Sequence, residues 1–108
     1  MVTIAKGNEM ATLINVFTVE PEHQQRLVGV LVEATEAVMS KQPGFVSANI
    51  HRSLDGTRVT NYAQWRSREA FEAMLQNREA GEHIGEAARI AKSFEPHLYE
   101  VSFVEELS

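Results

Sequence analysis

The spacing of apolar and polar residues along the chain predicts four β-strands. Each predicted strand is rich in β-branched and aromatic side chains, which favour the pleated backbone of a sheet. The four strands are predicted at residues 11–19, 45–53, 57–66 and 97–105. In the first of them, apolar side chains fall on both faces, and this pattern is typical of a strand that is buried on both sides.

A first amphipathic helix is predicted between the first two strands. It begins at Pro21, where the missing N–H of proline does no harm. One apolar stripe with spacings of four, three and four residues follows, at Leu27, Leu31, Ala34 and Val38. Pro43-Gly44 ends the helix.

A second helical region is predicted after the third strand. Ser67 is a good N-cap, and Phe71, Met74 and Leu75 form the apolar side of the first turns. Gly81 and Gly85 weaken the segment that follows. This region is therefore predicted as one helix or as two shorter ones, ending before Pro96.

The order strand, helix, strand, strand, helix, strand predicts an α+β fold of the ferredoxin-like βαββαβ type, with a four-stranded antiparallel sheet. Its helices cover only one face of the sheet. A second, identical sheet can cover the other face, so a homodimer is expected. Residues 1–10 are predicted to be a flexible leader, and residues 11–108 a single domain.

Composition excludes several classes of function. The 108 residues include no cysteine, which excludes disulfides, thiolate nucleophiles and cysteine-bound metal. The net charge of −5 and the scattered basic residues argue against nucleic acid as a partner. No apolar run reaches the ~18–20 residues of a membrane span. A cytoplasmic location is expected, and the spacing of the histidines predicts no metal site.

Two amides and one large ring stand out within the predicted strands. Asn15 lies in the first strand, and Asn61 and Trp65 lie on one face of the third. A buried amide without a partner costs about 1–3 kcal/mol, so strands do not usually carry one for packing alone. These three side chains are therefore the first candidates for a binding site.

Three segments resemble the antibiotic biosynthesis monooxygenase family, and its anthrone oxygenases in particular. They read INVFTV, QPGFVSANIHRSLDGT and VTNYAQWRSREAFEAML. The resemblance implies a dimeric α+β barrel. It also implies a cofactor-independent monooxygenase that oxidises an anthrone-like polyketide or a quinol with molecular oxygen. Quinol oxygenases, haem-degrading enzymes and small-molecule isomerases belong to the same family.

The resemblance also implies roles for particular residues. Asn15, Asn61 and Trp65 correspond to the catalytic residues of the anthrone oxygenases. Phe71 replaces a tyrosine found in some members, so a step that depends on that hydroxyl is not available to this chain. Substrate-binding positions are expected at Val59, Phe71 and Met74.

His51 and Asn49 are further candidates, and their placement depends on the hairpin between the second and third strands. A three-residue loop, Leu54-Asp55-Gly56, puts both side chains on the Trp65 face, whereas a two-residue loop puts them on the other face. Glycine at the third loop position favours the first alternative. His51 and Asn49 are accordingly predicted to bind substrate, with His51 as a possible base.

Two other functions remain open from the sequence. The first is a non-catalytic protein of the same fold that binds small molecules. The second is haem binding through His83, because a histidine in this region is the iron ligand of the haem-degrading branch. The match to that branch is poor, since its tryptophan and histidine fall on Met74 and Ile84. A surface position is the preferred interpretation of His83.

Overall fold

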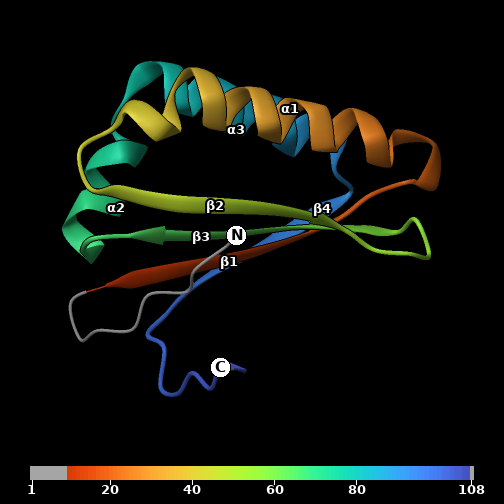
Figure 1. Ribbon diagram of the computed structural model, residues 1–108. Helices are drawn as coiled ribbons and strands as arrows, with labels where there is room; N and C mark the ends of the chain where they lie inside the picture. The colour runs from red at the N-terminus through yellow and green to blue at the C-terminus, as the bar shows by residue number, and fades with distance from the viewer. Residues whose placement is uncertain (1–9, 108) are drawn as a thin grey trace.

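The computed structural model describes residues 10–107. Its helices cover one face of a four-stranded antiparallel sheet (Figure 1). The elements along the chain are β1 (Ala11–Thr18), η1 (Pro21–His23), α1 (Gln24–Ala37), η2 (Met39–Lys41), β2 (Phe45–Arg52), β3 (Arg58–Trp65), α2 (Arg68–Leu75), α3 (Arg78–Ile90) and β4 (Ser93–Tyr99). The predicted ferredoxin-like α+β fold is confirmed. The predicted leader lies outside the described residues, except for Met10.

The strand order is β2-β3-β1-β4, so β1 and β3 are central and β2 and β4 are edges. Every pairing is antiparallel. Helices α1 and α3 pack side by side over the sheet, and α2 lies at the end of β3 (Figure 1). Among the described residues, no helix is long and apolar enough to cross a membrane.

The second helical region is two helices, and side-chain caps define where each begins. The Ser67 hydroxyl accepts a hydrogen bond from the Ala70 N–H at 3.0 Å, as predicted for an N-cap. The Asn77 side chain accepts one from the Ala80 N–H at 3.0 Å and so begins α3. A polar residue at each start satisfies amides that the helix itself leaves unpaired.

The prediction for the last strand was wrong in its position. Strand β4 spans Ser93–Tyr99, and residues 100–107 form no helix or strand. Pro96 lies inside this strand and faces Asn15 of β1. Proline is tolerated there because β4 pairs on one side only, so the missing N–H interrupts no second ladder. Phe94 therefore joins the sheet.

The hairpin prediction was also wrong, by one residue. Ser53 pairs with Arg58, which leaves a four-residue loop of Leu54 to Thr57. The Asp55 carboxylate accepts hydrogen bonds from the Thr57 hydroxyl at 2.7 Å, the Thr57 N–H at 3.0 Å and the Ser53 hydroxyl at 2.8 Å. These bonds, with the Thr57 hydroxyl first, lower the pKa of Asp55 to about 2. They hold Thr57 in the loop rather than in β3.

We expect Gly81→Ala to stabilise the fold. Gly81 is in α3 without a positive φ, and a Cβ added there meets no atom within 4 Å. Alanine restricts the unfolded chain and favours helix, which should raise the free energy of unfolding by about 0.4–1 kcal/mol in thermal or urea denaturation. Gly44→Ala is the contrasting variant, because its φ is 87° and its Cβ meets that of Ala70 at 2.5 Å. A loss of stability in Gly81→Ala contradicts the prediction.

Candidate active site

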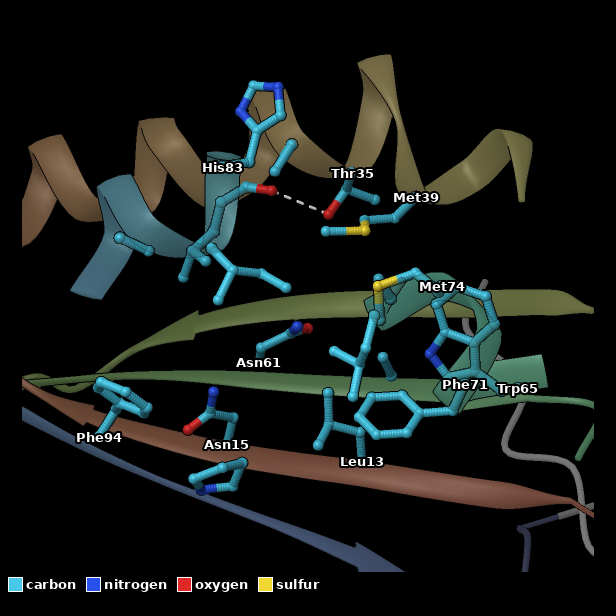
Figure 2. Close-up of a pocket in the computed structure, with 18 of the residues that line it drawn as sticks. Leu13, Asn15, Thr35, Met39, Asn61, Trp65, Phe71, Met74, His83 and Phe94 are labelled. Carbon is cyan, nitrogen blue, oxygen red and sulfur yellow. Dashed lines mark hydrogen bonds between the residues drawn. The ribbon is translucent and has the colours of Figure 1, made fainter. Parts of the chain in front are cut away.

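A cavity of about 310 Å³ lies between the sheet and the helices. Its floor is the inner face of the sheet, and its roof comes from α1 and α3. The lining is largely apolar, with few polar groups, and this is the usual character of a pocket for a small organic ligand. Figure 2 shows its side chains projecting from the strands and helices toward one another.

The cavity separates two clusters of buried side chains. The first cluster consists of Phe17, Val19, Leu27, Leu31, Val59 and Ala87. The second consists of Val38, Trp65, Met74 and Ala80, with Phe45 and Phe71 packed against it. Each cluster fills one end of the space under the helices. The middle of the sheet is thus left open to a ligand.

Asn15 and Asn61 meet in the middle of the cavity floor. They are direct cross-strand partners in the β1–β3 register, and side chains in such pairs are about 5 Å apart. Both amides project from the sheet into the space below the helices (Figure 2). The strand pattern alone predicted that each amide is unusual. Their pairing depends on the register.

The side-chain oxygens of Asn15 and Asn61 are buried and accept no hydrogen bond. Among the residues that the structure describes, they are the only buried side-chain nitrogen or oxygen atoms without a hydrogen-bond partner. Each one carries a desolvation cost of about 1–3 kcal/mol. Unsatisfied polar atoms in an apolar cavity indicate a site that a polar ligand completes.

An aromatic wall closes one end of the cavity. Trp65 is 2% exposed, and its ring meets Phe45 and Phe71 edge to face, at centroid distances of 5.5 and 6.3 Å. A bulge in β2 between Phe45 and Ser47 turns Phe45 to the inner face, opposite Trp65. The indole nitrogen lies on the side of the ring that faces the cavity (Figure 2). Trp65 is therefore both a core residue and part of the lining.

The predicted site residues divide into two groups. Asn15, Asn61, Trp65, Phe71 and Met74 all line the cavity, as expected. The roles assigned to them remain predictions.

Three predicted substrate-binding residues do not line the cavity. His51 pairs with Thr60 and Asn49 with Tyr62, so the four-residue loop turns both to the other face of the sheet. The Asn49 amide donates to the Tyr62 carbonyl at 3.4 Å. Val59 is on the inner face, but it is 0% exposed inside the first cluster. The structure thus corrects the expected face of His51 and Asn49 and places Val59 in the core beneath the cavity, and the roles of all three in substrate binding remain untested predictions.

His83 lies at the roof of the cavity, in α3. Its imidazole points away from the cavity (Figure 2). This orientation agrees with the surface position preferred from the sequence and does not present the ring to a ligand below. No group of three or more potential metal ligands occurs in the described part of the chain.

Sequence reasoning missed the β4 side of the site. Phe94, Pro96 and Leu98 line the cavity, opposite the aromatic wall or beside the amides. The misplaced last strand concealed them, although alternate apolar residues at 94, 96 and 98 are themselves a strand signal. Met39 and Thr35 of the roof carried no signal that separates them from ordinary helix residues.

Comparison with known proteins agrees with this arrangement. The sequence profile described as "Antibiotic biosynthesis monooxygenase" matches residues 10–86, which is most of the chain. The chain belongs to this family. The match includes β1, β2, β3 and α2, and therefore the Asn15–Asn61 pair and Trp65.

Relatives within and around the family support the assignment. Tetracenomycin-F1 monooxygenase of Streptomyces glaucescens is 51% identical over 74 residues. That alignment covers 68% of this chain and 66% of the relative, a little under two thirds of its length. SnoaB, a cofactor-independent oxygenase from Streptomyces nogalater, has a TM-score of 0.74 and 25% identity, over 89% of this chain and 96% of its own.

The fold is shared more widely than the sequence. A conserved protein from Methanosarcina mazei has a TM-score of 0.76 at 15% identity, over 85% of this chain and 92% of its own. Similarity at that level shows the fold alone. Chemistry in the antibiotic biosynthesis monooxygenase family must therefore be argued from the site.

Proposed function

We propose that this protein is a cofactor-independent monooxygenase that oxidises an anthrone-like polyketide or a quinol with molecular oxygen. The observation that carries the proposal is the pair of unsatisfied amides, Asn15 and Asn61, in an apolar cavity beside Trp65. The names of two relatives, a tetracenomycin-F1 monooxygenase and a cofactor-independent oxygenase, support the same reaction class.

The proposed reaction begins with transfer of a proton from the acidic methylene of the anthrone to solvent. The resulting enolate transfers one electron to oxygen, and the radical pair combines to form a C–O bond. The peroxide anion formed in this way takes a proton back from solvent and becomes a hydroperoxide. Loss of water from that hydroperoxide leaves a carbonyl in place of the methylene. One oxygen atom of O₂ thus enters the product, and the other leaves as water.

The amides would act on the oxygen of the enolate. Side-chain N–H groups of Asn15 and Asn61 can donate to that oxygen and stabilise the negative charge as it develops. The largely apolar lining strengthens such bonds, because its local dielectric constant is lower than that of water. Trp65 would hold the plane of the aromatic system by stacking or by donating its indole N–H. Phe71 and Met74 would shape the same end of the pocket.

His51, the possible base suggested by the sequence, lies on the other face of the sheet. The described residues that line the cavity include His83 and His97 but no carboxylate. Hydrogen bonds to the enolate oxygen lower the pKa of the substrate methylene, so the protein contributes to deprotonation by stabilising the anion.

Oxygen uptake tests the proposal directly. The purified protein should consume oxygen when dithranol, an anthrone with hydroxyl groups flanking its carbonyl, is added, and it should form the quinone in equal amount. Binding of dithranol without oxygen uptake favours the non-catalytic alternative. A Soret band on haem titration that His83→Ala abolishes favours the haem alternative. Either result contradicts the proposed oxygenase.

The proposal includes the cytoplasmic location expected from the sequence. It also includes a homodimer formed through the outer face of the sheet. That face is covered by no helix (Figure 1) and bears the half-buried apolar side chains of Ile14, Val16 and Tyr62. Exposed Tyr99 lies on the same face at the edge.

Sedimentation should give twice the mass of the chain, and Val16→Glu should shift the protein toward monomer. A stable wild-type monomer at micromolar concentration contradicts the dimer.

A further inference from the structure

Small side chains hold helix α3 in place over the cavity. Its buried residues are Ala80 and Ala87, whereas α1 buries Leu27 and Leu31. Burial of a leucine side chain removes far more apolar surface from water than burial of an alanine methyl group. The main packing partners of α3 are the helices α1 and α2 rather than the strands below (Figure 1). Of the two roof helices, α3 is therefore the less firmly attached.

Two glycines lie inside α3 at positions where the folded helix does not require them. Neither Gly81 nor Gly85 has a positive φ. A Cβ added at Gly81 meets no atom within 4 Å, and one added at Gly85 meets Arg89 Nη1 at 3.5 Å, an ordinary contact. Glycine favours local opening of a helix, because it gains more backbone freedom than alanine when the helix unfolds. Both glycines thus loosen α3.

Ile84 lies on the buried face of α3 and is nevertheless exposed. Ala80, Ile84 and Ala87 are four and three residues apart, so they share one face of the helix. The two alanines are 0% and 1% exposed, but Ile84 is 38% exposed and lines the cavity. Its side chain therefore borders the cavity where the alanines border the packed core. A ligand in the cavity would give Ile84 an apolar surface to pack against.

The rim of the cavity carries further exposed apolar side chains. Phe94 of β4 is 47% exposed, lines the cavity and has its ring 6.0 Å from that of Phe17. Leu75, the last residue of α2, is also exposed and lines the same cavity. Water contact with such a rim is unfavourable, and movement of the roof over a ligand removes part of it. Closure of the rim on an occupied cavity is therefore favourable.

We propose that α3 is a lid on the cavity. Residues 81–86 open to admit a ligand and then close over it, with Ile84 packing on the bound molecule. Ala80 and Ala87, on either side of this segment, stay anchored in the two core clusters. Segments with few buried apolar contacts are the ones that open locally in folded proteins. The inference goes beyond the proposed function, because it concerns the entry of any apolar ligand, whatever reaction follows.

A single thiol inside the cavity measures how often the lid opens. The chain has no cysteine, so Ala63→Cys places one thiol at a cavity-lining position that is 3% exposed. N-phenylmaleimide is a neutral aromatic reagent, and mass spectrometry follows its addition to the thiol. Labelling of the folded protein should be at least about 10-fold slower than labelling in urea, because the helix must open first.

Glycine variants in the Ala63→Cys background assign this rate to α3. Gly81→Ala and Gly85→Ala should each slow labelling by up to about 5-fold, the factor expected from the helix propensities of the two residues. Gly29→Ala is the matched control, because Gly29 lies inside α1 and a Cβ added there also meets no atom within 4 Å. It should raise the melting temperature as Gly81→Ala does, and it should leave the labelling rate unchanged.

Amide hydrogen exchange tests opening and closure separately. In the unmodified protein, amides of residues 81–86 should exchange at least about 10-fold faster than those of residues 27–34 in α1. After labelling of Ala63→Cys, the phenyl ring of the reagent occupies the cavity. Exchange of residues 81–86 should then become slower, and Ile84→Ala should weaken this effect because the lid loses its contact with the ring.

Several outcomes overturn the lid. Equal labelling rates in all the glycine variants show that the cavity admits the reagent without movement of α3. Absence of labelling in the folded protein shows that α3 does not open. Exchange of residues 81–86 as slow as that of α1, or unchanged after labelling, contradicts opening or closure. If Ala63→Cys does not fold, Ala34→Cys provides a buried thiol on the roof. None of these measurements depends on oxygen consumption, so they decide independently of the proposed function.

Discussion

Asn61→Ala should lower the turnover number by about 10²–10³ while changing substrate affinity far less. The reason is that an oxyanion donor acts mainly on charge that develops in the transition state. Asn61 lies directly opposite Asn15 on the cavity floor, and no described residue donates a hydrogen bond to its side-chain oxygen. Steady-state oxygen consumption with dithranol, fitted for kcat and KM separately, measures the effect.

Thermal stability should respond to the same change in the opposite way. Removing an unsatisfied buried amide relieves a desolvation cost, so the melting temperature of Asn61→Ala should stay the same or rise. Asn49→Ala is the control, since this amide donates to Tyr62 on the far face of the sheet. It should keep full turnover. Unchanged turnover in a folded Asn61→Ala variant removes Asn61 from the mechanism.

Trp65→Ala should cost about 3–5 kcal/mol of unfolding free energy, as expected when a large buried aromatic side chain is truncated. Trp65 is 2% exposed and contacts both Phe45 and Phe71, so its loss leaves a hole that the second core cluster cannot refill. Urea denaturation measures the loss. A change below about 1 kcal/mol contradicts the central position of Trp65 in this cluster.

Trp65→Phe separates packing from hydrogen bonding by the indole. Phenylalanine keeps a ring against Phe45 but loses the N–H that faces the cavity. Its stability should lie between those of the wild type and Trp65→Ala. If stacking is the main role of Trp65, turnover of Trp65→Phe should remain near that of the wild type. A loss as large as that of Asn61→Ala instead assigns the indole N–H to the reaction.

The strand and helix order could be predicted because local signals mark it. Ser67 caps α2 and Gly44 takes a positive φ before β2, and both depend on residues close in sequence. The last strand could not be placed in this way. Proline usually interrupts helices and central strands. Pro96 is tolerated in β4 only because that strand forms an edge of the sheet. Edge position depends on the whole sheet.

The candidate site was predicted in part for the same reason. Asn15, Asn61 and Trp65 stand out because polar or bulky residues interrupt apolar strands. His51 and Asn49 were misplaced because a single residue in the loop decides the face of every side chain in β2. The hydrogen bonds of Asp55 set that loop length. Side-chain bonding of this kind is not visible in a pattern of apolar and polar positions.

The sequence by itself determined the element order, the family and the three side chains most unlike their surroundings. These follow from periodicity, capping and local composition, which act over a few residues. Only the tertiary structure decided that Asn15 and Asn61 face each other on neighbouring strands. It also decided that no donor reaches the side-chain oxygen of either residue. Register and burial arise from the packing of β1, β3, β4 and the helices together, because a side chain is satisfied or left unpaired by neighbours distant in sequence.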